Sequence, residues 1–410
     1  MLNYARAAYL LLRMKHSQWR SPSQIRSYQS RKLAELVSHA RFNIPFYRRL
    51  PQIRTIDDIG KLPITTKEML RSQNDRFIDA RLDKESLIRL PTSGSSGIPI
   101  NSYFSLPEGI YGTVLRYHML TECGVRPEHL TAIIMHSREP YTLLQRFGLF
   151  RYRYLSVHDD EETNLGILRS LRPDFLLSFP SGFPILSGLN DAGDRMRLKG
   201  IISTSELLQP KSRALAEKSF SCKVRNTYSV NEMRNVAWEC EKGSMHVNSD
   251  SVIAEILGND GEPAGEGEVG EVVLTPLWRR SMTLIRYAIG DRAAIGPPCE
   301  CGRGSTVLTS LEGRSNDRIH LPSGRSIPGS CLAGALMHLP VLQYQVEQVE
   351  PARFIIRLVH GGTFSKAMEA DAKAILSKEL GEKVRIELEF PERLEKTAGG
   401  KICCVISRIK

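Results

Sequence analysis

Hydrophobic and polar positions follow two different periods along the chain. Residues 1–50 alternate apolar and basic positions at helical spacing, with a break at residues 21–23 and a stop at residues 43–45. From about residue 90 to residue 310, helical stretches alternate with short apolar β-type runs. These runs are Ala132–Met135, Phe175–Phe179, Gly200–Ser203 and Val224–Tyr228. This alternation predicts an α/β fold of layered sheets and helices with largely buried strands.

A second pattern begins after Gly313. Strands are expected over residues 342–348, 354–358 and 384–390, with an amphipathic helix over 365–380. A β-β-α-β unit of about 95 residues can bury a core of its own. We therefore expect a large domain over residues 1–314, which includes a basic helical region at 1–50, and a small mobile α+β domain over 315–410.

Composition and charge limit the class of protein. Hydrophobic residues make up 41% of the chain and charged residues 25%, which excludes wholesale disorder and collagen-like repeats. No stretch approaches the roughly 20 apolar residues that span a bilayer, and no secretory signal is recognised. A cytoplasmic protein is therefore expected.

The net charge of +11 is concentrated at the N-terminal end. Residues 1–50 hold ten Lys and Arg against one acid, so the excess does not form a basic groove through the fold. Nucleic acid is therefore not expected as a partner. The favoured interpretation is a solvated helix face, and the alternative is a docking surface for an anionic membrane or an acidic partner.

The strongest chemical signal is a run of hydroxyls and glycines that follows an apolar segment. It reads Thr92-Ser93-Gly94-Ser95-Ser96-Gly97. Glycines let backbone amides approach an anion closely, and the hydroxyls add donors, so the run could hold phosphates. No Gly-Lys-Ser/Thr follows, so it is not a Walker-type loop, and a plain Ser/Gly surface loop is the alternative.

Four later segments carry charged or polar side chains at strand ends and turns. They are residues 228–232 with Tyr228, Asn231 and Glu232, residues 285–291 ending in Asp291, residues 313–319 with Arg314, and residues 395–401 ending in Lys401. Taken singly, each is equally explained as a common turn or a solvated charge.

Taken in order, these motifs resemble the signature motifs of the adenylate-forming enzymes, the superfamily of acyl-CoA synthetases, peptide-synthetase adenylation domains and luciferases. The sequence is most similar to the phenylacetate–CoA ligase-like branch, which includes ligase-like proteins associated with capsular polysaccharide synthesis. Further matches at residues 44–47, 62–67 and 179–181 extend the resemblance from about residue 40 to residue 405.

The resemblance implies a nucleotide site. The loop from Thr92 to Gly97 would hold the β- and γ-phosphates of ATP, and Glu232 would ligate Mg²⁺, a hard cation that prefers oxygen ligands. The other implied contacts are Tyr228 and Ser205-Glu206 on either side of adenine, Asp291 on the ribose hydroxyls, Arg314 on ribose or phosphate, and Asn231 on a phosphate.

The resemblance also implies the moving parts. Lys401 would reach the α-phosphate while the substrate carboxylate attacks it, and the small domain would then rotate about a hinge at residues 316–317. Two departures from the family pattern stand out: Ser229 and Asn231 replace the usual Gly and Ser or Thr, and Asn316 replaces the usual first aspartate of the hinge.

The eight cysteines suit a reducing compartment better than a disulfide framework. Four residues form two pairs of candidate zinc ligands: Cys240 with His246, and Cys299 with Cys301. Unpaired buried cysteines are the alternative, but the related branch often carries zinc at such an arrangement. Four protein ligands would make the zinc structural. Cys403 and Cys404 are expected in a strand and not as ligands.

The leading functional hypothesis is an enzyme that uses Mg·ATP to convert a small carboxylic acid to an acyl-adenylate and then transfers the acyl group to coenzyme A. One alternative passes the acyl group to an amine or hydroxyl, for example on a sugar in polysaccharide biosynthesis. Another is a degenerate nucleotide-binding scaffold. The identity of the acid and the oligomeric state, a homodimer included, are left open.

Overall fold

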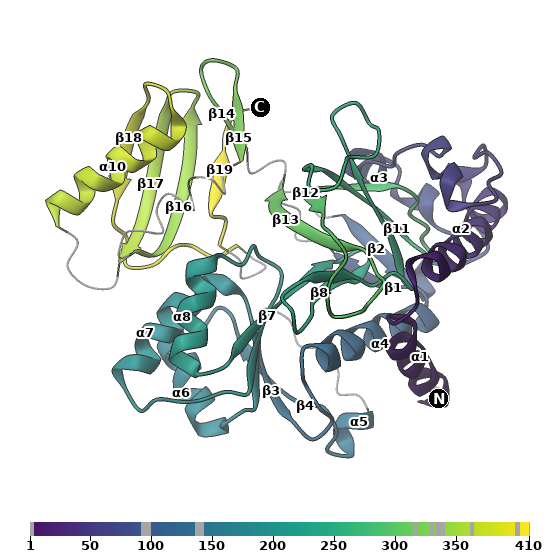
Figure 1. Cartoon of the computed structure of the whole chain (residues 1–410), viewed down its shortest axis with the longest axis horizontal. Helices are drawn as coiled ribbons and strands as arrows, with labels where there is room; N and C mark the ends of the chain where they lie inside the picture. The colour runs from purple at the N-terminus through teal and green to yellow at the C-terminus, as the bar shows by residue number, and fades with distance from the viewer. Residues whose placement is uncertain are drawn as a thin grey trace. The chain divides into compact units, whose positions relative to one another are not determined.

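The computed structural model describes residues 4–91, 100–135, 143–314, 318–328, 332, 341–360, 365–397 and 402–409 (Figure 1). The chain divides into two units, and each unit is formed by two separate stretches of sequence. The first unit comprises residues 1–124 and 225–311, and the second comprises residues 125–224 and 312–410. The division into domains at residue 314 stays a prediction.

The first unit begins with the helices α1 (Tyr4–Ser17) and α2 (Pro22–Asn43). Ser21 caps α2, because its side chain accepts a hydrogen bond from the Gln24 N–H and the Gln24 side chain accepts one from the Ser21 N–H. The predicted break and stop are therefore confirmed. The other helical elements of this unit are η1 (Pro45–Tyr47), η2 (Ile56–Lys61), α3 (Lys67–Ser72), η3 (Asn74–Phe77), η4 (Lys84–Ser86) and α4 (Leu106–Glu122).

The main sheet of the first unit has the strand order β10-β11-β12-β13-β9-β8-β7. Its strands are β7 (Lys223–Val230), β8 (Arg234–Glu239), β9 (Met245–Val247), β10 (Val252–Leu257), β11 (Gly270–Pro276), β12 (Tyr287–Ile295) and β13 (Val307–Arg314). A separate hairpin pairs β1 (Ile88–Pro91) with β2 (Asn101–Phe104). Leu33 and Leu36 of α2 pack with Val272 and Leu274 of β11 in the core of this unit.

The second unit contains a parallel sheet with the order β6-β5-β3-β4. Its elements are β3 (Leu130–Met135), α5 (Leu143–Arg146), β4 (Arg151–Ser156), α6 (Glu161–Leu171), β5 (Phe175–Ser178), η5 (Pro180–Gly182), α7 (Phe183–Ala192), β6 (Gly200–Ser203) and α8 (Pro210–Phe220). The helices α6, α7 and α8 pack against the buried strands (Figure 1). The predicted α/β alternation is therefore confirmed.

The C-terminal stretch of the second unit forms a four-stranded sheet, β18-β17-β16-β19, with α10 packed on it (Figure 1). Its elements are β14 (Arg318–His320), β15 (Ser326–Pro328), β16 (Val341–Glu350), β17 (Arg353–His360), α10 (Lys366–Leu380), β18 (Arg385–Glu389) and β19 (Val405–Ser407). The predicted β-β-α-β order is confirmed. Cys403 and Cys404 precede β19, so the strand expected there begins one residue later.

The helices were compared with the length and hydrophobicity of a membrane span. Within the part of the chain that the structure describes, no helix combines the length and the apolar character needed to cross a bilayer.

Candidate functional site

Two side chains predicted to bind different parts of a nucleotide lie together in the first unit. The Tyr228 hydroxyl donates a hydrogen bond of 2.6 Å to Asp291 Oδ2, although the two residues are 63 positions apart in the sequence. Tyr228 belongs to β7 and Asp291 to β12. Both side chains are half-buried, so they remain open to a ligand.

Irregular strand geometry positions both of these side chains. The pairing of β7 with β8 changes register between Tyr228 and Ser229. The pairing of β11 with β12 changes register between Ala288 and Arg292, a stretch that includes Gly290 and Asp291. Gly290 adopts a φ of +75°, a conformation that side chains with a Cβ rarely adopt. Bulges of this kind turn a side chain away from the regular alternation of a strand. The glycine before Asp291 is therefore what lets β12 present the carboxylate.

Glu232 is the buried carboxylate of this region. It lies two residues after the end of β7, is 5% exposed, and its Oε1 accepts a hydrogen bond of 3.1 Å from the Tyr287 hydroxyl. A carboxylate has several acceptor positions, so this bond leaves capacity for a cation. Asn231, next to it, is exposed. The Tyr287 hydroxyl therefore fixes the position of a carboxylate that keeps unused acceptor capacity.

Arg279 supports Glu232 and was missed by sequence reasoning. Its fully buried guanidinium donates to the Glu232 carbonyl and, at 2.5 Å, to the Tyr103 carbonyl, and it lies 3.8 Å above the Phe104 ring. Burial lowers the pKa of Arg279 to about 10, which still leaves the group charged at neutral pH. The sequence signal was an adjacent pair of arginines that begins three residues after the end of the buried strand β11.

In the second unit, the Ser205-Glu206 segment follows β6. Ser205 has a φ of +69°, and the Glu206 carboxylate accepts hydrogen bonds from the Ser181 N–H at 3.1 Å and from the Ile402 N–H at 3.2 Å. Ile402 directly follows Lys401 in the chain. The backbone next to the predicted lysine therefore contacts the segment predicted to flank adenine.

Several predicted site residues lie outside the described residues. These are Thr92, Ser93, Gly94, Ser95, Ser96, Gly97, Lys401 and the hinge at 316–317, and the side chain of Arg314 is not described either. The strands on either side of the first of these segments are paired in register, with Pro91 opposite Asn101.

The four predicted zinc ligands form a compact cluster in the first unit. One ligand atom from each of Cys240, His246, Cys299 and Cys301 lies within 4.8 Å of all the others. Cys240 Sγ lies 3.7 Å from Cys299 Sγ, and Cys301 Sγ lies 3.2 Å from His246 Nε2. A tetrahedral ion with Zn–S of about 2.3 Å and Zn–N of about 2.0 Å would separate such pairs by about 3.8 and 3.5 Å. The cluster therefore fits zinc.

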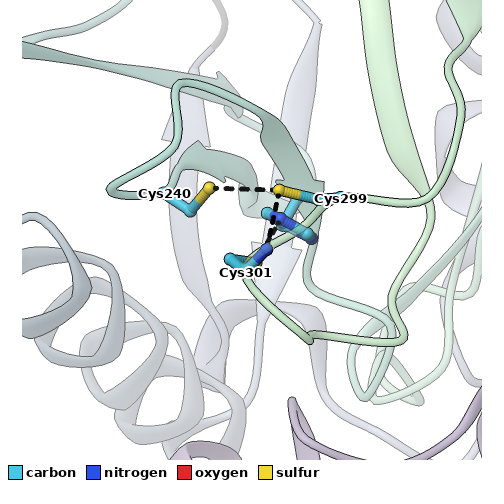
Figure 2. Close-up of side chains that lie close together, drawn as sticks. Cys240, Cys299 and Cys301 are labelled. Atoms are coloured by element: carbon cyan, nitrogen blue, oxygen red, sulfur yellow. Dashed lines mark hydrogen bonds between the residues drawn. The ribbon is translucent and has the colours of Figure 1, made fainter.

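Turns bring the ligands into this arrangement. Cys240 follows β8 and His246 lies in β9, so a tight turn at Gly243 places both on one hairpin. Cys299 and Cys301 come from the connection between β12 and β13, where the Cys301 N–H donates to Cys299 Sγ at 3.4 Å (Figure 2). The side chains of Cys240 and Cys299 point toward one another (Figure 2).

The surroundings of the cluster favour a bound cation. Burial lowers the pKa of His246 to about 4, so its imidazole is neutral, which is the form that ligates metals. The other ring nitrogen, Nδ1, lies 3.0 Å from Ser305 Oγ, which would fix the ring with Nε2 facing the cluster. Burial also raises the pKa of the Cys240 thiol to about 11, so zinc binding would release its proton.

Arg303 supplies positive charge beside the cysteines. Burial lowers the pKa of Arg303, but hydrogen bonds to Cys301 and Glu241 raise it by a larger amount. The pKa of Arg303 therefore lies above its ordinary value. Three thiolates around a divalent ion carry a net charge of −1. The guanidinium of Arg303, which contacts Cys301, would offset this charge. Arg303 was also missed by sequence reasoning, although it lies two residues after Cys301.

No protein-family model matches the chain. A phenylacetate-coenzyme A ligase from Thermus thermophilus is 25% identical over 367 residues, which cover 79% of this chain and 78% of that protein. Protein CapK from Staphylococcus aureus is 21% identical over 422 residues, covering 93% of this chain and 89% of that protein.

Solved structures give the same picture at the level of the fold. A 2-hydroxyisobutyryl-CoA ligase in its postadenylation state matches with a TM-score of 0.78 and 18% identity, covering 93% of this chain and 89% of that one. At this identity the match shows the fold alone. Sequence and fold together confirm that this chain resembles the adenylate-forming superfamily and, within it, the phenylacetate–CoA ligase-like branch.

Proposed function

We propose that the chain is an AMP-forming acid–thiol ligase that activates a carboxylic acid with ATP and transfers the acyl group to coenzyme A. The hydrogen bond from Tyr228 to Asp291, near the buried Glu232 in the turn between β7 and β8, is the observation that carries this proposal. These three residues match the adenine, ribose and metal positions of the family motifs. The name of the relative from Thermus thermophilus, a phenylacetate-coenzyme A ligase, supports the same chemistry.

In the first step a carboxylate oxygen of the acid would attack the α-phosphorus of ATP. The bond from that phosphorus to the bridging oxygen would break, and pyrophosphate would leave with the electron pair. Backbone amides and hydroxyls of the Thr92–Gly97 loop would hold the departing phosphates. Lys401 would offset the negative charge where two anions meet, a contribution that is typically worth about 10²–10³ in rate.

Mg²⁺ fits this site through Glu232, a carboxylate fixed by Tyr287 and able to accept further contacts. When bound, the ion would supply positive charge to the phosphates. Asp291 would accept hydrogen bonds from the ribose hydroxyls, and the Tyr228 hydroxyl would hold its carboxylate in position.

In the second step the thiol of coenzyme A would lose its proton and its sulfur would attack the acyl carbon. A thioester would form, and AMP would leave with the electron pair of the broken acyl–oxygen bond. Rotation of the C-terminal region about residues 316–317 would move Lys401 away from the acyl-adenylate and let the thiol of coenzyme A reach it. The hydrogen bond between Ile402 and Glu206 supports the approach of the lysine loop to the nucleotide segment before that exchange.

We further propose that zinc at Cys240, His246, Cys299 and Cys301 is structural. With four protein ligands the ion would have no open position for a substrate. It would hold the β8–β9 hairpin against the connection that follows β12, and β12 carries Asp291. The zinc would therefore stabilise the sheet that presents the ribose-binding carboxylate.

Carboxylate-dependent exchange of pyrophosphate into ATP, measured across a library of acids, tests the first step. At least one acid should support exchange, and Lys401→Ala should lower its rate by about 10²–10³. Lys378→Ala, at an exposed lysine near the end of α10, is the matched control and should leave the rate unchanged. Absence of exchange with every acid would favour the degenerate scaffold.

The acyl acceptor needs a separate assay. With an acid that supports exchange, thioester formation with coenzyme A should exceed acylation of amine and hydroxyl acceptors. The reverse result would favour transfer to an amine or to a sugar hydroxyl while leaving the adenylation step intact.

A further inference from the structure

A cavity of about 450 Å³ lies in the first unit, against α1, α2, α4 and the turn after β11. Its size is that of a small-molecule site. None of the candidate nucleotide or zinc residues lines it. The cavity is therefore a separate feature that the proposed reaction does not use.

Three side chains that line this cavity each carry a buried hydrogen-bond donor with no acceptor among the described residues. They are Nε of Arg13, Nε1 of Trp278 and Nη1 of Arg280. Folded proteins pair nearly all of their buried polar groups, with protein or with a bound molecule. Arg13 comes from α1, whereas the other two lie in the turn after β11. Side chains from two distant parts of the sequence, each with an unpaired donor, thus meet at this cavity.

The charge of the cavity wall is positive. Arg6, Arg13, Lys32 and Arg280 line it, against the single carboxylate of Asp250. Asp250 already accepts hydrogen bonds from Ser17 and, at 3.4 Å, from Arg20.

Glu35 offsets part of this charge from outside the lining. It lies 2.7 Å from the Lys32 ammonium and 3.9 Å from the Arg280 guanidinium. Burial nevertheless lowers the pKa of Arg280 below its ordinary value, because its neighbours do not fully replace the lost water. An anion in the cavity would complete this compensation.

The remaining wall is apolar and aromatic. The Trp278 ring stacks on Tyr111, with centroids 4.9 Å apart and planes inclined by 25°, and Leu10, Ile110 and Leu277 extend the surface. Leu106 also lines the cavity and is 64% exposed, so the apolar wall reaches the molecular surface. A simple inorganic anion would leave this surface uncovered.

We propose that the cavity binds a small amphiphilic anion, with a carboxylate or phosphate head group held by Arg13, Arg280 and Trp278 and an apolar tail against Leu10 and Ile110. This site lies beyond the proposed ligase function, since it shares no residue with the nucleotide site. It also modifies the expectation of a solvated basic face, because Arg13 is half-buried and lines this cavity.

Calorimetric titration of the full chain tests the proposal. Decanoate and decyl phosphate, kept below their micelle concentrations, should each bind at one site per chain. Acetate and inorganic phosphate lack the tail, and decanol lacks the charge, so each should bind at least tenfold more weakly. Decyl phosphate has no carboxylate to activate, so its binding cannot be attributed to the acyl site of the proposed ligase.

Three variants and a control locate the binding. Arg13→Gln and Arg280→Gln remove the charged donors, and Ile110→Trp fills the cavity; each should weaken decyl phosphate binding at least tenfold. Arg26→Gln is the control, because Arg26 is exposed on α2, pairs with Asp57 and does not line the cavity. Thermal unfolding of each variant checks that the chain remains folded.

Some results would overturn the proposal. Failure of both amphiphiles to bind would do so, as would binding that Arg13→Gln and Ile110→Trp leave unchanged in folded protein. Equal binding of decanol and decanoate would show that the cavity does not recognise an anionic head group, which would refute that part of the proposal. Binding only to vesicles of anionic lipid, without binding of the single amphiphiles, would instead assign the basic residues to a membrane-docking surface.

Discussion

Replacing one ligand of the cluster formed by Cys240, His246, Cys299 and Cys301 tests the zinc proposal most directly. Cys301→Ser exchanges a thiolate for a hydroxyl, which is a poor zinc ligand, and removes the sulfur that lies 3.2 Å from His246 Nε2. The wild-type chain should contain one zinc per molecule after purification without added metal. The variant should contain much less than one.

The size of the stability effect follows from linkage between metal binding and folding. With free zinc a thousandfold above its dissociation constant, binding stabilises the folded state by about 4 kcal/mol. In a unit of roughly 210 residues, each kcal/mol shifts the unfolding midpoint by about 2–4 °C. Loss of the metal should therefore lower the midpoint of the first unit by about 8–16 °C.

The assay combines elemental analysis with thermal unfolding, before and after dialysis against a chelator. Cys222→Ser is the matched control, since Cys222 is a free cysteine of intermediate exposure outside the cluster. The control should retain its zinc and its response to chelator. If Cys301→Ser and Cys222→Ser had equal metal content and equal midpoints, the cluster would be four ordinary buried side chains and the zinc proposal would fail.

Three other perturbations test the first unit. Tyr228→Phe deletes the hydroxyl that donates to Asp291 at 2.6 Å, so the KM for ATP should rise about tenfold or more in exchange assays, while thermal stability changes little. Arg279→Met removes a buried cation that donates to two carbonyls, so the free energy of unfolding should fall by about 3–5 kcal/mol in urea titrations; a loss below 1 kcal/mol would contradict this role. His118 is buried and neutral, with its pKa lowered to about 4 by burial, so its unfolded form takes up a proton first as the pH falls. This histidine should therefore cost stability between about pH 6.5 and pH 4, by about 3 kcal/mol at most, and His118→Phe should reduce the slope of unfolding midpoint against pH in that range.

The basic N-terminal region shows how one composition can serve two roles. Arg26 and Arg31 are exposed on α2, as expected for a solvated helix face. Arg13 differs, because the packing of α1 on α4 buries half of its side chain beside an apolar wall. Charge counted along the sequence does not distinguish these cases, since burial depends on which other elements cover each helix.

The strands could be located from sequence because buried strands need local runs of apolar residues. The predicted run at 200–203 coincides with β6, and the run at 175–179 differs from β5 by one residue. The helix expected over 365–380 also formed, capped by Ser365 and ended by Gly381 in the left-handed region. Local preferences of this kind need no knowledge of the rest of the chain.

The order of the strands within the sheets could not be predicted from local sequence. The sheet of the first unit places β13 beside β9, and the unit combines residues 1–124 with residues 225–311. Each strand offers the same backbone donors and acceptors to any neighbour, so pairing is decided by which apolar faces can be buried together.

The sequence by itself determined the resemblance to adenylate-forming enzymes and the residue types available for chemistry. Only the tertiary structure brought Tyr228 to Asp291 and gathered four zinc ligands from segments 59 positions apart within one small volume. It alone identified Arg279 as the buried support of Glu232 and placed Arg13 with Arg280 in the wall of one cavity. The physical reason is that motif residues are specified along the chain, whereas burial, hydrogen-bond partners and cavities arise from packing between segments that are distant in sequence.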